Sequence, residues 1–165
     1  MRALGIDPGT ETTGYAIVDE DANGILHLID YGVIKTHKLN SPEIRLQIIF
    51  KELSRIISLH RPETGAVEKL FFQKNVTNAI AVGQARGVIL LAMVEAGMEI
   101  LEYSPQAVKQ AVTGYGAAEK KQVQIMVKTM LDMEQLPKPD DAADAIAIAI
   151  CHLHAIGYRA RLNGN

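Results

Sequence analysis

The sequence predicts an α/β protein whose mixed five-stranded sheet is flanked by helices. Two observations support this fold class. The chain opens with three strand-like segments separated by short turns, and strand-like segments then alternate with helix-like ones. The first pattern is typical of an antiparallel meander, and the second adds parallel strands that are joined by helices.

The N-terminal meander is expected at residues 2–8, 13–19 and 25–35. These segments are rich in apolar and β-branched side chains, as buried strands are. The turns between them contain glycine, including an Asn-Gly pair at residues 23–24, which is a strong hairpin signal.

The rest of the chain alternates between strands and helices. Ser41-Pro42 is a favourable helix start, and apolar residues recur at helical spacing from there to the Arg61-Pro62 break. We expect further strands at 65–70 and 98–103, and further helices at 75–96, 104–112, 117–130 and 140–158. We therefore expect one domain over residues 1–158 and a frayed C-terminal tail over residues 159–165.

Composition is that of an ordinary globular domain. The 165 residues are 48% hydrophobic and 22% charged. Cys151 is the single cysteine, which excludes an intrachain disulfide and a cysteine-based zinc site and fits a reducing cytosol. The N-terminus has no long apolar run, so we expect a cytoplasmic protein without a membrane span. The net charge of −2 does not exclude a nucleic-acid enzyme, because it averages over all faces.

Acidic residues interrupt apolar surroundings at three places in the chain. Asp7 and Glu68 lie in expected strands, and Asp141 and Asp144 lie three residues apart on one face of the last helix. Each has an ordinary interpretation: a turn after the first strand, an edge strand facing water, or acids that favour a helix N-terminus. A buried carboxylate without a partner costs several kcal/mol, so a shared compensating charge explains them better together.

Divalent cations would supply that charge. If the strands of Asp7 and Glu68 are neighbours and the last helix crosses them, the four carboxylates converge and would otherwise hold protons. Mg²⁺ prefers oxygen ligands and leaves positions for water and phosphate oxygens. Two such ions can promote in-line attack of water on phosphorus. The pattern therefore predicts magnesium-dependent hydrolysis of a phosphodiester, with manganese able to substitute.

Five segments of the chain also resemble a known family in order and spacing. The RuvC family of bacterial Holliday-junction resolvases is similar over residues 1–157, in the segments GIDPGTETTGYAIVD, AVEKLFFQKN, AVGQARGVI, SPQAVKQAVTGYGAAEKKQV and DAADAIAIAICH. The resemblance implies a ribonuclease H-like nuclease domain and a homodimer. It also implies a magnesium-dependent endonuclease that nicks two opposed strands of a four-way DNA junction symmetrically and acts with the RuvA–RuvB branch-migration complex.

The resemblance assigns the metal and catalytic roles to the four acids. Asp7 matches the first-strand acid, Glu68 the mid-chain acid, and Asp141 and Asp144 the pair of the DAAD segment. Asp140 makes this segment ambiguous, and we take Asp141 because a spacing of three from Asp144 is that of the family.

DNA contacts are expected around this acidic group. The resemblance implies that Phe71 stacks on a base near the crossover and that Lys109 and Lys120 approach the scissile strand, although Lys121 could replace Lys120. An exposed ring can stack on a base, and alternation along a strand predicts that one of the two adjacent phenylalanines is buried. The remaining candidates for DNA contact are Phe72, Lys74 and Arg86.

A homodimer suits this substrate, because a four-way junction has approximate two-fold symmetry. The expected helix at 75–96 has a smooth face of small residues that allows close packing between subunits, although part of it must also pack on its own sheet.

Three other functions are compatible with parts of the sequence. The segment DPGTETTGYAIVD also resembles the first phosphate-binding loop of the actin, hexokinase and Hsp70 superfamily, but those proteins pair two domains across a nucleotide. A YqgF-type nuclease shares the fold and acts on RNA. A module that binds junctions without cutting them would have no use for four acids beneath a phosphate.

Overall fold

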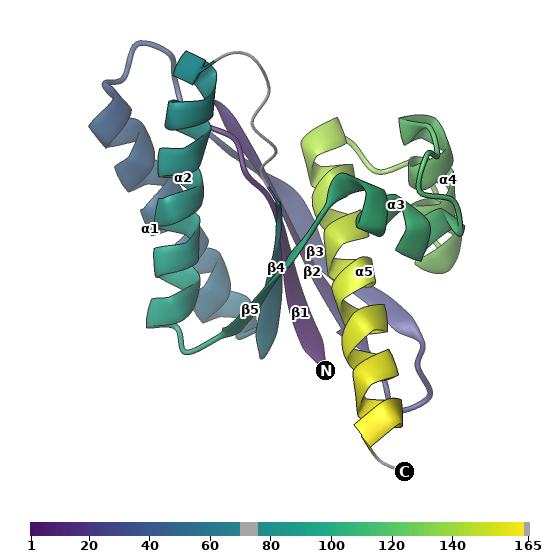
Figure 1. Ribbon diagram of the computed structural model, residues 1–165. Coiled ribbons are helices and arrows are strands. Elements are labelled where there is room, and N and C mark those ends of the chain that lie inside the picture. The colour runs from purple at the N-terminus through teal and green to yellow at the C-terminus, as the bar shows by residue number, and fades with distance from the viewer. Residues whose placement is uncertain (70–75, 164–165) are drawn as a thin grey trace.

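The computed structural model describes residues 1–69 and 76–163, and it describes the side chains of these residues except 76–78 and 160–163. The elements follow one another in the expected order (Figure 1). They are β1 (Arg2–Asp7), β2 (Thr12–Glu20), β3 (Leu26–Lys35), α1 (Pro42–His60), β4 (Thr64–Glu68), α2 (Val76–Glu95), β5 (Glu99–Tyr103), α3 (Pro105–Thr113), α4 (Lys120–Met130) and α5 (Asp140–Asn163).

The five strands form one mixed sheet in the order β3-β2-β1-β4-β5. The pairs β1–β2 and β2–β3 are antiparallel, whereas β1–β4 and β4–β5 are parallel. The meander and the parallel strands expected from the sequence are therefore both confirmed. Strand β1 is the centre of the sheet, with β4 directly beside it.

Helices cover both faces of the sheet. Figure 1 shows α1 and α2 on one side and α5, with α3 and α4, on the other. Successive side chains of β1 point to opposite faces of the sheet. Leu4 and Ile6 pack with buried residues of α1 and α2, whereas Ala3 packs with those of α5. Two cores therefore hold the central strand from opposite sides.

Helix α5 lies unusually close to the sheet. Its segment from Ala145 to Leu153 is almost wholly buried and rich in alanine. A Cβ atom at Gly5 of β1 would come within 2.6 Å of the main-chain nitrogen of Ala149, and a side chain there would also collide with the carbonyl oxygen of Ala145. Glycine in the strand and alanine in the helix thus allow the two backbones to approach.

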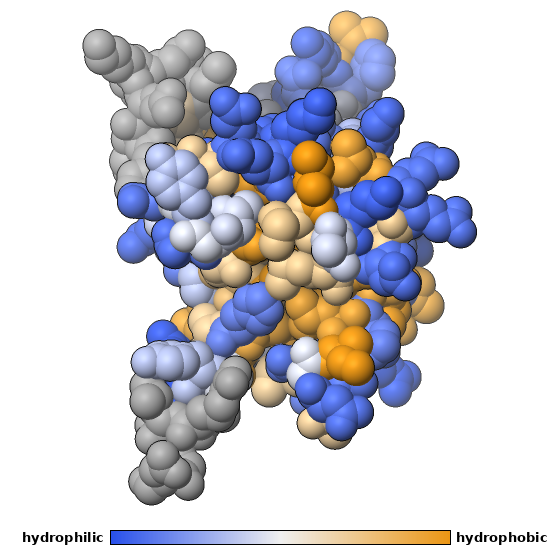
Figure 2. Space-filling model, turned by 90° about the vertical axis from the view of Figure 1, so that its right-hand side faces the viewer, coloured by the Kyte–Doolittle hydropathy of each residue, from blue (hydrophilic) through white to orange (hydrophobic). Residues whose placement is uncertain are grey.

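The outer face of this helical layer is amphipathic. Figure 2 views the side on which α3, α4 and α5 lie, where apolar surface in the middle is bordered by hydrophilic side chains. Tyr115, Ile125 and Met126 contribute exposed apolar area there. Within the part of the chain that the structure describes, no helix has the length and apolar character needed to cross a membrane.

Two helix boundaries differ by more than one residue from those expected. Helix α4 begins at Lys120 instead of residue 117, because Glu119 is its N-cap and forms a reciprocal capping box with Gln122. Helix α5 continues to Asn163, five residues beyond the expected end at Tyr158. The part of the expected tail that is described is therefore helical.

Candidate active site

The ends of two neighbouring strands bring Asp7 and Glu68 together. Asp7 is the last residue of β1 and Glu68 the last of β4. These strands are parallel, and the preceding residues Ile6 and Val67 are register partners. Because parallel strands end at the same edge of a sheet, both carboxylates lie at one edge. Glu68 is not on an edge strand, since β5 pairs with β4 on its other side.

The start of α5 adds the other two acids. Gly14 is the register partner of Asp7 on β2, and a Cβ atom on Gly14 would collide with the main-chain carbonyl of Asp141. The first turn of α5 therefore lies directly over the end of β1. Asp144, one turn further along, lines the same cavity as Glu68.

Burial and mutual repulsion make Asp7, Glu68 and Asp144 reluctant to ionise. Burial, and then the negative charges of Glu68, Asp144 and Asp141, raise the pKa of Asp7 to about 8. Burial and the charge of Asp144 raise the pKa of Glu68. Burial also raises the pKa of Asp144, although its hydrogen bond to Lys120 opposes this effect. The acids thus share one electrostatic environment.

Lys120 is the cation that enters this group. Its Nζ donates a hydrogen bond of 2.8 Å to Oδ2 of Asp144 and lies 3.4 Å from Oδ2 of Asp140. Burial lowers the pKa of Lys120, but the hydrogen bond and charge of Asp144, together with Asp140, outweigh it and the pKa is raised. Asp140 also accepts a hydrogen bond of 3.0 Å from Nε2 of Gln124, so it faces α4.

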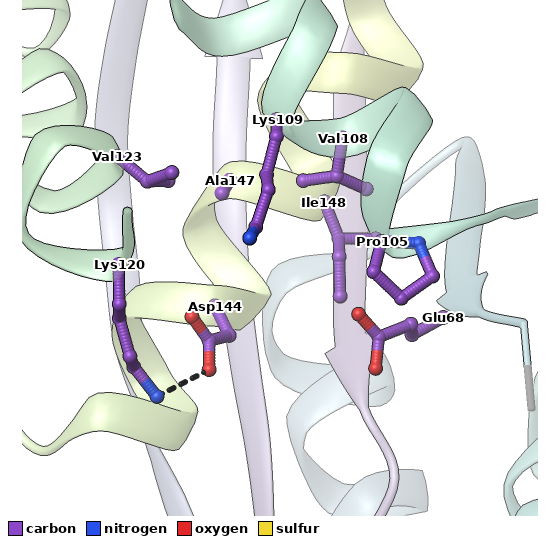
Figure 3. A pocket seen from close by; sticks show the side chains of 9 residues that line it. All are labelled: Glu68, Pro105, Val108, Lys109, Lys120, Val123, Asp144, Ala147 and Ile148. Carbon is purple, nitrogen blue, oxygen red and sulfur yellow. Dashed lines mark hydrogen bonds and ion pairs between the residues drawn. The ribbon is translucent and has the colours of Figure 1, made fainter. Parts of the chain in front are cut away.

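A cavity of about 200 Å³ opens beside these groups. Its charged lining consists of Glu68, Lys109, Lys120 and Asp144, and its apolar wall comes from α3, α4 and α5. In Figure 3 the ammonium group of Lys109 extends into the space above Asp144 and Glu68. The cavity therefore presents both acids and bases to whatever enters it.

Asp141 borders a different hollow. This second hollow, of about 340 Å³, lies over the loop that follows Asp7 and is lined by Gly9, Thr10, Glu11, Thr12, Ala81, Val82 and Asp141. The two acids of the last helix thus open toward different hollows.

The acids do not form a ready-made metal cage. Among the described residues, no three His, Cys, Asp or Glu side chains are grouped so that they could hold a metal ion as they stand. Lys120 engages Asp144, and Asp141 opens toward the second hollow. The donor chemistry nevertheless fits Mg²⁺, since carboxylate oxygens are its preferred protein ligands. Burial and the neighbouring carboxylates raise the pKa of Asp7, and a bound cation would offset both effects.

The expected DNA contacts are distributed unevenly. Lys109 and Lys120 line the first cavity, and Lys121 is exposed beside Lys120. Arg86 is largely buried and forms an ion pair with Glu102 of β5, so its charge is already engaged. Phe71, Phe72 and Lys74 lie outside the described residues.

A buried histidine fixes α5 to the sheet, a feature that the sequence reasoning missed. The Nε2 atom of His152 lies 2.8 Å from Oγ1 of Thr64, and its Nδ1 atom lies 3.1 Å from the hydroxyl of Tyr103. Burial, and the charge of Arg159, lower the pKa of His152 to about 4, so the ring is neutral at pH 7. This contact connects β4 and β5 to the helix that carries Asp144. The sequence signal that could have revealed this contact is the presence of three polar side chains, Thr64, Tyr103 and His152, within largely apolar segments.

Comparison with known proteins is consistent with this geometry. Residues 3–152 match the family model described as crossover junction endodeoxyribonuclease RuvC. The chain is 53% identical over 158 residues to the protein of that description from Heliobacterium modesticaldum, which covers 96% of this chain and 97% of that protein. It is 56% identical over 155 residues to that of Chloroflexus aurantiacus, covering 93% of each.

Solved structures show the same similarity. Thermus thermophilus RuvC in complex with Holliday junction substrate superposes with a TM-score of 0.90 at 35% identity, covering 99% of this chain and 96% of that one. A second structure of Thermus thermophilus RuvC superposes with a TM-score of 0.88, also at 35% identity. The alignment covers 96% of this chain and 97% of that one.

Proposed function

Because this chain belongs to the RuvC family of crossover junction endodeoxyribonucleases, it is a nuclease that resolves Holliday junctions, and we propose that Asp7, Glu68, Asp141 and Asp144 are its catalytic acids. The observation that carries the assignment is the pairing of Asp7 and Glu68 at the ends of adjacent parallel strands, beneath the first turn of α5. The fold is ribonuclease H-like, and the family places this activity in DNA recombination and repair.

We propose that these acids hold Mg²⁺, two ions per subunit, and that Mn²⁺ can substitute. The donor set is all carboxylate, and burial and the neighbouring acids, which raise the pKa of Asp7, are effects that bound cations would offset. When bound, such ions activate a water molecule and stabilise the charge that develops on the phosphate and the leaving oxygen.

The protein's own residues position and neutralise the substrate in this proposal. Asp7 and Glu68 end rigid strands, so their carboxylates are fixed relative to each other. Lys109 and Lys120 line the cavity beside Glu68, and their ammonium groups can approach the non-bridging oxygens of a DNA phosphate. The apolar wall of Val108, Ala147 and Ile148 limits water on the other side.

The wider DNA contacts are also part of the proposal. Lys121 is exposed next to Lys120 and can reach a neighbouring phosphate. Base stacking by Phe71 or Phe72 and phosphate contact by Lys74 stay predictions for a segment outside the described residues. Arg86 is a weaker candidate than the sequence indicated, because Glu102 already neutralises it.

A homodimer would give the enzyme two sites for the two opposed strands. Helix α2 supports this proposal, since Ile80, Leu91 and Val94 are half or more exposed. A Cβ atom at Gly83 or Gly87 would meet nothing within 4 Å, so this helix also offers room for a close neighbour. Action together with the RuvA–RuvB complex is proposed from the family resemblance alone, and a cytoplasmic location is proposed because the single cysteine fits a reducing compartment.

The direct test is cleavage of a synthetic mobile four-way junction with and without Mg²⁺. We expect paired nicks at symmetric positions in two opposed strands, only when the metal is present, and ends that a ligase can seal. A structured RNA serves as the comparison, because preferential cleavage of RNA would favour the YqgF-type activity. Binding without cleavage under all metal conditions would contradict the assignment of the acids.

A further inference from the structure

We infer that Lys120 is a resident counter-ion of the acidic site, so that a divalent metal ion binds there in competition with its ammonium group for Asp144. The inference rests on the proposed function, because it takes Asp144 to be a metal ligand. It concerns what the chain does before the metal arrives, which the family's activity leaves open.

The position of Lys120 is built into the start of α4. Lys120 is the first residue of that helix, and the capping box between Glu119 and Gln122 fixes the backbone on both sides of it. From there the side chain reaches across to α5 and donates its hydrogen bond of 2.8 Å to Oδ2 of Asp144 (Figure 3). The contact therefore depends on two ordered helix termini.

The charge of Lys120 lies among the acids. Its Nζ is 2.8 Å from Oδ2 of Asp144 and 3.4 Å from Oδ2 of Asp140, and Lys120 lines the same cavity as Glu68. One ammonium group thus does part of what a metal ion would do, since it makes the ionised acids tolerable.

A metal ion at Asp144 would compete with Lys120 electrostatically. Bound to Oδ2, it would place a double positive charge within a few ångströms of the ammonium group, where repulsion is strong. We therefore expect Lys120 to move away from Asp144 when the metal binds.

The side chain is free enough to make this exchange. The side chains of Lys120 and Asp144 are 49% and 35% exposed, so the ion pair is partly solvated and modest in strength. Lysine also has a long flexible stem that can carry its charge to another partner. The cavity lined by Lys109 and Glu68 lies directly beside it and gives the released ammonium group a destination near the substrate.

Metal binding to the protein alone tests the inference, with Mn²⁺ as the probe and the electron paramagnetic resonance signal of free Mn²⁺ as the readout. The key variant is Lys120→Met, which keeps the aliphatic stem and removes the charge. Lys128→Met is the matched control, because Lys128 lies about two turns further along α4 and has no ion pair among the described residues. Titrations at pH 8.5 limit competition between protons and Mn²⁺ for the carboxylates.

We expect Lys120→Met, and equally Lys120→Gln, to bind Mn²⁺ about 3- to 5-fold more tightly than the unmodified protein, which is the scale of a partly exposed ion pair. Lys128→Met should stay within about twofold, on the scale of a distant screened charge. In the Asp144→Asn background the gain from Lys120→Met should vanish, because the contested oxygen is no longer charged.

The failures are distinguishable. If Mn²⁺ binding depends on Asp144 but Lys120→Met leaves it unchanged or weakens it, the counter-ion inference is wrong and the metal assignment stands. If Asp144→Asn and Asp7→Asn leave Mn²⁺ binding unchanged, the proposed metal site itself is wrong.

Discussion

Gly14 and Asp141 are in such close contact that any side chain at Gly14 would collide with the main-chain carbonyl of Asp141. Gly14 is also the register partner of Asp7. A residue without a side chain thus determines how near the last helix comes to the acid of the central strand.

Gly14→Ala should therefore impair catalysis solely by increasing the distance between the start of α5 and the end of β1. The added methyl group displaces the first turn of α5, and misplacement by about 1 Å can cost on the order of 100-fold in rate. We expect junction cleavage to fall by at least about tenfold, while circular dichroism shows a folded protein. Gly32→Ala is the control, because the atoms nearest to its methyl group would belong to the Tyr15 side chain, at 3.0 Å or more, and not to the backbone of α5. Unchanged cleavage by Gly14→Ala would show that this close approach is not required.

Asp7→Asn and Glu68→Gln should each abolish cleavage and preserve junction binding. Both changes remove a negative charge with little change of shape, so the DNA phosphates meet less repulsion. We expect cleavage to fall by at least about 100-fold, as is found when a group that stabilises transition-state charge is removed. Gel-shift affinity should be equal or higher.

Glu134→Gln serves as the control for this pair, since Glu134 is exposed and lies far along the chain from both Asp7 and Glu68. A variant of Asp7 or Glu68 that cuts at nearly the normal rate would refute the catalytic assignment.

The pKa of Asp7 predicts how stability depends on pH without metal. The carboxyl group titrates near 3.8 in the unfolded chain and at about 8 in the folded one. Between these values the folded state binds a proton that the unfolded state lacks. The contribution of Asp7 is therefore complete below about pH 3.8 and is lost as the pH rises through about 8.

Asp7→Asn should remove this dependence. In the presence of a chelator at pH 8.5, we expect its Tm to exceed that of the unmodified protein by roughly 3–8 °C, given about 2–4 °C per kcal/mol for a chain of this size. The difference should shrink at pH 5. Parallel melting curves of both proteins across this range would disprove the assignment of the raised pKa to Asp7.

Lys109→Met should weaken junction binding in a salt-dependent way. Its ammonium group extends into the cavity and has no ion pair among the described residues. Loss of one phosphate contact lowers the slope of log K against log salt by about 0.9. Lys128→Met is the control for net charge. An unchanged slope for Lys109→Met would exclude contact between Lys109 and a phosphate.

The exposed face of α2 can be tested with Leu91→Glu. A charge at this half-exposed position should disrupt an apolar contact between two copies. We expect sedimentation to show monomers, and a plasmid with an extruded cruciform to be nicked in one strand instead of linearised. An unaltered sedimentation coefficient would place the subunit contact elsewhere.

Much of this molecule could be predicted from its sequence. The strands and helices follow from periodicity and from turn and capping residues. The metal-site hypothesis required β1 and β4 to be neighbours, and they are. Local patterns failed where side chains from different elements meet. The start of α4 lies three residues later than expected, because Glu119 is the N-cap and its capping box with Gln122 depends on backbone geometry.

The site shows the same division. The sequence marked the acidic positions, because charge in an apolar segment is conspicuous. It did not reveal that Lys120 holds Asp144 or that Glu102 neutralises Arg86, since each pair joins elements that only the tertiary fold brings together. A lysine or arginine in an exposed helix looks the same in sequence whether its partner is a carboxylate or a phosphate.

The anchoring of α5 at His152 restricts where insertions and deletions can be tolerated in this chain. His152 and Asp144 are eight residues apart on one continuous helix, and His152 is fastened to β4 and β5 through Thr64 and Tyr103. Inserting a single codon between them would turn Asp144 by about 100° around the helix axis and shift it by about 1.5 Å. The hairpin at residues 21–25 does not connect two such fixed points, so changes of length should be tolerated there. Within this helix they should abolish activity.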